Sequence, residues 1–298
     1  MRTSRTDRRA AAGFLMPFVV LFAAFFVLPI GYAIYQSLLS VERAGPLGLG
    51  GSRTVFAGLS NYTEAFADSA FTDSILRVLL FAAVQVPVMI GLATLLALLL
   101  DAAAARAVPF FRSAYFLPYG VPGVIASILW GFLYVPGVSP IVDLLGSAGL
   151  DVDLLGSGSV LWAIANIVTW EFAGYNMLVV VAQLKSINSD LYAAAQIDGA
   201  NAWQVVRYVK LPLIRPAIVL TTVFTIIGTL QLFAEPLVLR PVSTAINTSY
   251  TPNLAAYTEA FVNNNYSLAA AQSVILAVAA CVLSFGFLRL VGRKGDDR

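Results

Sequence analysis

The sequence predicts an all-α integral membrane protein with six transmembrane helices, cytoplasmic N- and C-termini and a cytoplasmic helix-turn-helix loop. Three observations lead to this fold class. Hydrophobic residues make up 59% of the 298 positions and charged residues 11%, whereas soluble domains carry about 25% charged residues. Six apolar runs are each long enough to cross a bilayer, which takes about 20 residues. One polar segment, residues 186–216 and called the finger below, separates the fourth run from the fifth.

The six runs predict a single transmembrane domain over residues 1–298. The first run follows a basic head that contains four arginines. Because this run is long and no clear small-residue cleavage site follows it, we interpret it as a retained helix and not as a signal peptide. The expected spans lie at about residues 14–35, 75–100, 113–134, 160–184, 217–238 and 267–291.

The distribution of basic residues predicts the orientation. If the N-terminus is cytoplasmic, six spans return the C-terminus to the same side. Fourteen of the 18 Lys and Arg residues then lie in cytoplasmic segments. Cytoplasmic loops of membrane proteins carry such an excess of Lys and Arg, so the charges place both termini and the finger in the cytoplasm.

The finger is predicted to form two helices joined by a turn. Its alanine-rich first part favours a short helix, and Asp198-Gly199 indicates a turn, because glycine takes the positive φ that closes a helix. Asn201 is suited to cap a second helix. Pro212 and Pro216 are expected to end that helix, because proline lacks the amide that an interior helical turn requires.

The ordered string Tyr192-Ala-Ala-Ala-Gln-Ile-Asp-Gly-Ala200, followed by Leu211-Pro-Leu213, resembles the EAA loop of ABC-importer permeases. The resemblance is closest to the carbohydrate-uptake branch, which includes permeases for maltose-like oligosaccharides and glycerol phosphate. It covers nearly the whole chain, although only the finger carries a specific motif. In that family the loop is the coupling element that docks on the ATP-binding subunit. The resemblance therefore assigns ATPase coupling to Tyr192, Ala193, Ala194, Asp198, Gly199, Ala200, Arg207 and Pro212.

One position departs from the family pattern. The Glu of the family motif falls on Ala193, so any ion pair that this Glu would make with the ATPase is absent here or is supplied by another residue. The strength of the coupling therefore does not carry over from the family.

The resemblance also implies an assembly. It predicts two ATP-binding subunits, a second homologous permease subunit and an extracytoplasmic solute-binding protein, in the inner (cytoplasmic) membrane of a prokaryote. The implied transport is driven by ATP and Mg²⁺ bound to the partner ATPase, with no cofactor in this chain. The implied solute is a sugar or oligosaccharide.

Composition argues against several other functions. The chain contains no histidine and a single cysteine, Cys281, so histidine-based catalysis is excluded and a Cys/His metal site is not expected. No G-x-x-x-x-G-K-[ST] phosphate loop occurs, so a P-loop ATP site must come from another subunit. The net charge of +2 gives no indication of a nucleic-acid partner. We expect a permease subunit and not an enzyme.

Polar side chains within the apolar runs are the candidate substrate pathway, because such groups are costly at membrane depth and mark functional sites. Glu171 lies about eleven residues into the fourth span, which at about 1.5 Å per residue is near the bilayer middle. Carboxylate and amide groups beside aromatic faces suit a sugar, whose hydroxyls form hydrogen bonds while its ring face stacks. Packing between helices is the alternative role for the same side chains. The candidates are Asn166, Trp170, Glu171, Tyr175, Asn176, Gln231 and Glu235.

Two other functions remain open from the sequence alone. The chain could be a secondary transporter driven by an ion gradient, with Glu171 as the coupling group. It could also be a membrane assembly protein that transports nothing. Uptake that survives an ionophore, with ATP maintained, would argue against the first, and solute-dependent flux would argue against the second.

Overall fold

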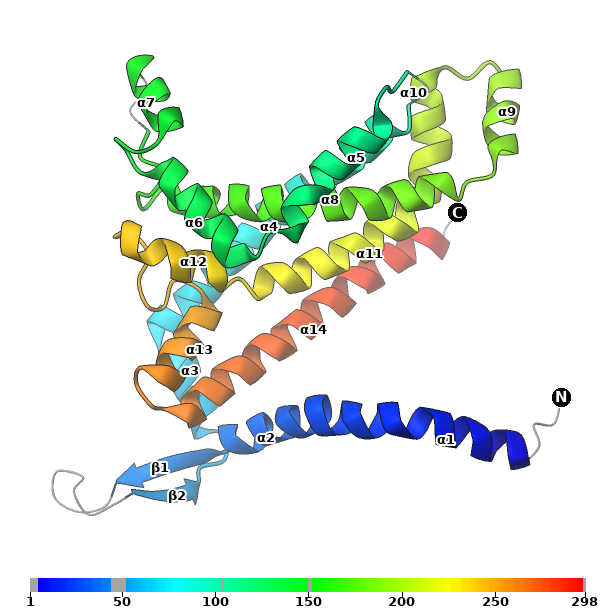
Figure 1. Cartoon of the computed structure of the whole chain (residues 1–298). Coiled ribbons are helices and arrows are strands. Elements are labelled where there is room, and N and C mark those ends of the chain that lie inside the picture. Colours follow the sequence, from blue (N-terminus) through cyan, green and yellow to red (C-terminus); the bar gives the residue numbers. More distant parts are fainter. Residues whose placement is uncertain (1–4, 44–51, 103, 150–151, 297–298) are drawn as a thin grey trace. The chain divides into compact units, whose positions relative to one another are not determined.

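A computed structural model describes residues 5–43, 52–102, 104–149 and 152–296 (Figure 1). The chain divides into two compact units, Met1–Thr72 with Ala255–Ala277 and Asp73–Leu254 with Val278–Arg298. The structure is mostly helical. Among the described residues, five helices are long and apolar enough to cross a membrane, and the number becomes six if one bent helix pair is counted as a span.

The first unit contains the first predicted span and a small β-hairpin. The span runs over Ala12–Ser37 as one nearly continuous helical stretch, and the hairpin pairs Leu39 with Phe56 in antiparallel register. Asn61 donates to the carbonyl oxygens of Ser37 and Leu39, at 2.7 Å each, and so fixes the helix that follows the hairpin to its first strand. The sequence did not predict these strands. The elements are α1 (Arg5–Phe22), a π-helix η1 (Ala23–Val27), α2 (Leu28–Ser37), β1 (Leu39–Arg43), β2 (Ser52–Phe56), α3 (Ser60–Ala67) and most of α13 (Pro252–Phe261).

The second unit is built around α8, the fourth predicted span. This helix has the largest buried share of any span, and α5, α6 and α11 pack along it (Figure 1). The elements are α4 (Ser69–Leu100), α5 (Val108–Phe116), a 3-10 helix η3 (Leu117–Gly120), α6 (Gly123–Tyr134), α7 (Pro140–Ser147), α8 (Val160–Lys185), α9 (Ser189–Ile197), α10 (Ala202–Gln204), a π-helix η4 (Val205–Lys210), α11 (Leu211–Leu230), α12 (Ala234–Leu239) and a 3-10 helix η5 (Arg240–Val242). The last helix, α14 (Tyr266–Asp296), belongs partly to each unit.

The third span is broken, and the expectation of one continuous helix over residues 113–134 was wrong. Two helical pieces, Val108–Gly120 and Gly123–Tyr134, meet at 99°. The break occurs at Val121-Pro122, where Val121 is extended with ψ 125°. A residue that precedes proline is pushed out of the helical region because it clashes with the proline ring. Two helical pieces at an angle therefore replace a straight span.

A single glycine sets how closely the bent pair approaches α8. A Cβ atom added at Gly174 would lie 1.8 Å from the carbonyl oxygen of Tyr115 and 3.0 Å from the Cα of Phe116. Only a residue without a side chain allows this backbone contact. The contact holds α5 and the start of η3 against the middle of α8.

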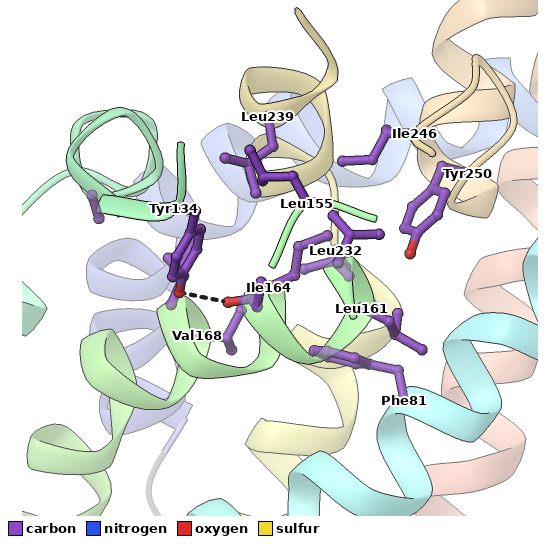
Figure 2. Packing of buried hydrophobic residues seen from close by; sticks show 14 of the residues in the cluster. Phe81, Tyr134, Leu155, Leu161, Ile164, Val168, Leu232, Leu239, Ile246 and Tyr250 are labelled. Atoms are coloured by element: carbon purple, nitrogen blue, oxygen red, sulfur yellow. Dashed lines mark hydrogen bonds between the residues drawn. The ribbon is translucent and has the colours of Figure 1, made fainter. Parts of the chain in front are cut away.

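The main buried cluster surrounds the first half of α8. Figure 2 shows Ile164 and Leu161 of α8 among side chains from α4, α6 and the segment that follows α11. The Tyr134 hydroxyl donates to the carbonyl oxygen of Ala163 at 3.0 Å and accepts from Asn166 Nδ2 at 2.9 Å. These bonds link α6 to α8 within the packed region.

The finger consists of α9, a turn, and a second helix that begins at Ala202. Gly199 adopts φ +77°, and the Ala200 amide donates to the Ala195 carbonyl at 2.9 Å, which closes α9. Asn201 caps the second helix through a capping box with Gln204. The turn at Gly199 and the cap at Asn201 therefore lie at the residues for which the sequence predicted them.

The second helix does not end at the prolines, so that expectation was wrong. From α10 it continues through η4 into α11, which contains Pro212 in its first turn and Pro216 inside it. The wider π turn directly before Pro212 leaves room for the proline ring and its missing hydrogen bond. Membrane helices tolerate proline for this kind of reason.

Candidate functional site

A cavity of about 520 Å³ lies in the second unit between α8, α11 and the segment that joins α11 to α12. This volume is within the range of small-molecule sites, about 300–1,000 Å³. The wall is mostly apolar and aromatic, with a few polar groups. The lining residues are Met89, Tyr119, Val168, Phe172, Tyr175, Asn176, Phe224, Thr225, Gly228, Thr229, Gln231, Leu232, Phe233, Ala234 and Glu235.

Aromatic rings form one wall of this pocket. The ring of Tyr119 stacks on that of Tyr175, with centroids 4.8 Å apart and planes 18° apart, and meets Phe172 edge-on at 5.8 Å. Tyr119 belongs to η3, so the break in the third span brings it to α8. Flat aromatic faces can pack against the apolar face of a sugar ring, and the tyrosine hydroxyls supply polar tips.

Polar groups from α8 and α11 point into the same region. Asn176 is buried, and its Nδ2 donates to Met89 Sδ at 3.2 Å, a weak acceptor, and to Thr225 Oγ1 at a long 3.4 Å. The hydroxyl of Thr229 is buried and has no hydrogen-bond partner within the described chain. Groups that are bonded weakly or not at all can bond a hydroxylated ligand at little cost.

Two carboxyl groups converge beside the pocket at Gly123, the first residue of α6. A Cβ atom at Gly123 would lie 3.3 Å from Glu171 Oε1 and 3.8 Å from Glu235 Oε1. Glu171 comes from α8 and Glu235 from α12, and both are buried. Two acidic side chains from separate helices therefore face one small space.

The predicted pathway residues divide into two groups. Tyr175, Asn176, Gln231 and Glu235 line the pocket, and Glu171 lies next to Glu235.

The other two pathway candidates lie outside the pocket lining. Asn166 donates to Tyr134, and Trp170 packs edge-on against Trp130 at 5.9 Å. These contacts fit packing between helices, the alternative considered for them.

Sequence reasoning missed Tyr119 and Phe172. The available signal for Tyr119 was the string Pro118-Tyr119-Gly-Val-Pro122, in which two prolines can interrupt the third span. Discontinuous helices at membrane depth mark binding sites in transporters.

At the finger, one charged contact ties the second helix to the end of α4. Lys210 Nζ lies 2.6 Å from Asp101 Oδ2 and 5.5 Å from the ring centroid of Tyr192. Burial, and then the nearby charge of Asp101, raise the pKa of the Tyr192 hydroxyl. The base of the finger is therefore a compact group from α4, α9 and η4.

The tip of the finger is apolar and exposed. Ile197 is 86% exposed, Trp203 65% and Tyr208 70%. Ala193 and Ala194 are also exposed on α9, and the Arg207 guanidinium lies 5.9 Å from the Tyr208 ring. Of the predicted coupling residues, only Tyr192 and Ala200 are partly covered; the others, Asp198, Gly199 and Pro212 included, are exposed.

Comparison with known proteins identifies a family and several relatives. Residues 55–295 match the family described as "Binding-protein-dependent transport system inner membrane component". The trehalose transport system permease protein SugA of Mycobacterium tuberculosis is 31% identical, over 96% of this chain and 90% of the relative. The lactose transport system permease protein LacF of Rhizobium radiobacter is 30% identical, over 91% of this chain and 90% of the relative. The sn-glycerol-3-phosphate transport system permease protein UgpA of Agrobacterium fabrum is 30% identical, over 93% of each chain.

The fold also matches a solved structure. A chain from a crystal structure of a bacterial ABC transporter that imports the acidic polysaccharide alginate superposes with a TM-score of 0.81. The match covers 97% of this chain and 96% of that chain, at 22% identity. At this identity the likeness establishes the fold.

Proposed function

The chain belongs to the family of inner membrane components of binding-protein-dependent transport systems. We propose that its pocket binds the solute and that its finger docks on an ATPase subunit and couples ATP hydrolysis to transport. The chain is a permease subunit of a sugar ABC importer, as its relatives are named permease subunits and not enzymes. The solute proposed for it is a sugar or oligosaccharide.

The composition of the pocket supports passage of a sugar. The Tyr119–Tyr175 stack offers a flat apolar face, and Asn176, Thr229 and Gln231 offer hydrogen-bonding groups at separate points of the wall. A second homologous permease subunit would complete the path, and an extracytoplasmic solute-binding protein would deliver the solute.

The exposed tip of the finger is the observation on which the coupling proposal rests. Ile197, Trp203 and Tyr208 are large, exposed apolar side chains on a segment that we place in the cytoplasm. Exposed apolar groups rimmed by polar residues mark protein interaction sites. Their proposed partners are two ATP-binding subunits that hold ATP and Mg²⁺.

The base of the finger would carry the motion inward. The second helix of the finger is continuous with α11, and Lys210 bonds Asp101 at the end of α4. A displacement of the finger would therefore move α11 and α4 together, and alternating access would follow from rigid rotation of the helices that surround the pocket. The family relationship does not favour an ion-gradient transporter or a non-transporting assembly protein.

The orientation proposed for the chain follows from its basic residues. The N- and C-termini and the finger face the cytoplasm of a prokaryotic cell, and the spans lie in its inner membrane. In this orientation the finger is on the side that supplies ATP.

The test is a bulky substitution at the turn of the finger. Gly199→Trp should abolish ATP-dependent uptake by the complex purified from native membranes and reconstituted in vesicles, because it places a large ring at the proposed docking surface. Gly137→Trp is the matched control: Gly137 has a nearly identical φ, +76°, and, like Gly199, open space around the position of a Cβ. Equal uptake by both variants would refute docking at the finger.

A further inference from the structure

The two carboxyl groups beside Gly123 are the feature that the proposed function leaves unexplained. Transport of a neutral sugar needs no charge at this point. Yet one oxygen of Glu171 and one of Glu235 lie within 4 Å of the position that a Cβ atom on Gly123 would occupy. They come from α8 and α12, so the packing of the bent helix pair with these two helices brings them together.

No basic side chain neutralises them within the part of the chain that the structure describes. The one ion pair found there joins Lys210 and Asp101, at the base of the finger. Glu171 is only 3% exposed, and its Oε2 is buried without a hydrogen-bond partner. An unpaired buried carboxylate is among the most costly groups in a protein interior or a membrane.

One member of the pair borders the pocket, and the other lies directly behind it. Glu235 itself lines the cavity, and Val168 and Phe172, which flank Glu171 on α8, line it as well. Lys and Arg are absent from the residues that form the wall. A ligand in the pocket therefore contacts a wall that contains the acidic Glu235, with Glu171 behind it, and the rings of Tyr119 and Tyr175.

We propose that Glu171 and Glu235 form a subsite for a protonated amine on the transported sugar, so that the solute is an amino sugar. This inference rests on the proposed function and specifies its solute. An ammonium group has three donors and can bond oxygens of both carboxylates at once. Neighbouring tyrosine faces also attract a cation.

The same charges exclude other solutes. A phosphate or uronate group next to two carboxylates would be repelled at close range in a medium that screens charges weakly. The pocket therefore suits a cationic sugar better than the anionic solutes carried by some relatives. Gly123 matters for the same reason, because a side chain there would occupy the space between the carboxylates.

The test compares two sugars that differ only in charge. Trehalose and its 2-amino-2-deoxy analogue have nearly the same size, with an ammonium in place of one hydroxyl. Their binding to the purified complex, without the solute-binding protein, can be measured by calorimetry. Because a hydrogen bond to a charged group is stronger than one between neutral groups, the amino sugar should bind about tenfold or more tightly than trehalose.

Variants assign the preference to the pair. Glu171→Gln and Glu235→Gln keep the shape of each side chain and remove its charge. In each variant the ratio of the affinity for the amino sugar to that for trehalose should fall from about tenfold to about one. Glu64→Gln is the matched control, since Glu64 is exposed on α3 and remote in sequence from the pocket. It should leave the preference intact.

Several results would overturn the inference. They are equal binding of the two sugars, binding of neither, or an unchanged preference in both Gln variants. A further one is a gain in trehalose binding on addition of Na⁺ or K⁺ that equals the gain given by the amino group. The last result would identify an inorganic cation as the occupant. ATP-dependent uptake of trehalose by the unmodified complex without any preference for the amino sugar would remove this inference alone. Uptake that does not depend on ATP would instead remove the proposed function.

Discussion

Substitution of Gly174 by alanine should disturb the pocket from a distance. The new Cβ would lie 1.8 Å from the carbonyl oxygen of Tyr115 and 2.5 Å from its carbonyl carbon. Ordinary contact between such atoms begins near 3.5 Å, so the backbone of α5 must retreat by about 1.7 Å. Overpacking of this kind costs about 1–3 kcal/mol or more, and we expect the upper end because backbone, not a flexible side chain, must move.

The assay has a thermal part and a binding part. Gly174→Ala should lower the Tm of the purified complex, and it should weaken sugar binding because Tyr119 follows the displaced α5 and η3. Gly91→Ala in α4 is the matched control, as no atom lies within 4 Å of a Cβ there. If the two variants had the same Tm and the same affinity, the close approach of α5 to α8 would not be what positions the aromatic wall.

Two further predictions concern the finger. Asp101→Asn should lower ATP-driven uptake and cost about 1–3 kcal/mol of stability, because it weakens the 2.6 Å contact with Lys210 and a hydrogen bond between charged groups contributes that much. The exchange of the two charges, Asp101→Lys with Lys210→Asp, should restore part of the uptake. No recovery would count against a role for the ion pair. Asn201→Ala should lower the stability of the second finger helix by about 1 kcal/mol, because it removes the capping box with Gln204. Amide hydrogen exchange at residues 202–204 should then become faster, and unchanged exchange would contradict this prediction.

Hydropathy and charge predicted the helical class and the approximate position of the spans. Four predicted spans correspond to single long helical stretches, because a run of apolar residues with internally bonded backbone has few alternatives in a bilayer. The fifth, residues 217–238, is divided between α11 and α12, which are separated at residues 231–233. The turn at Gly199 and the cap at Asn201 were also predictable, since each depends on one residue and its nearest neighbours in sequence.

Features that depend on distant residues were not predictable in the same way. The break of the third span at 99° was not predicted, because it depends on packing against α8 as well as on Pro122. Pro212 and Pro216 were expected to end the helix, yet the π turn before Pro212 accommodates its ring, and α11 continues through Pro216. The hairpin Leu39–Phe56 has no strong alternation of apolar and polar residues, so its pairing could not be read from hydropathy.

The candidate site was predicted only in part for the same reason. Tyr175 and Asn176 stood out as polar groups on an apolar helix, and both line the pocket. Asn166 is also a polar group on this helix, but it is exposed outside the pocket lining and donates to the Tyr134 hydroxyl of α6. The face of α8 on which a polar residue lies decides between the two roles, and that face depends on which helices pack there.

The most direct test of the coupling claim is a cross-link from the tip of the finger. After Cys281 is replaced by serine, Ile197→Cys would carry the only thiol, at a side chain that is 86% exposed. With a short thiol-reactive cross-linker in the purified complex, this cysteine should attach to a subunit that hydrolyses ATP. Labelling of the same cysteine in intact cells by a reagent that cannot cross the membrane, with no cross-link to any ATP-hydrolysing subunit, would contradict the claim.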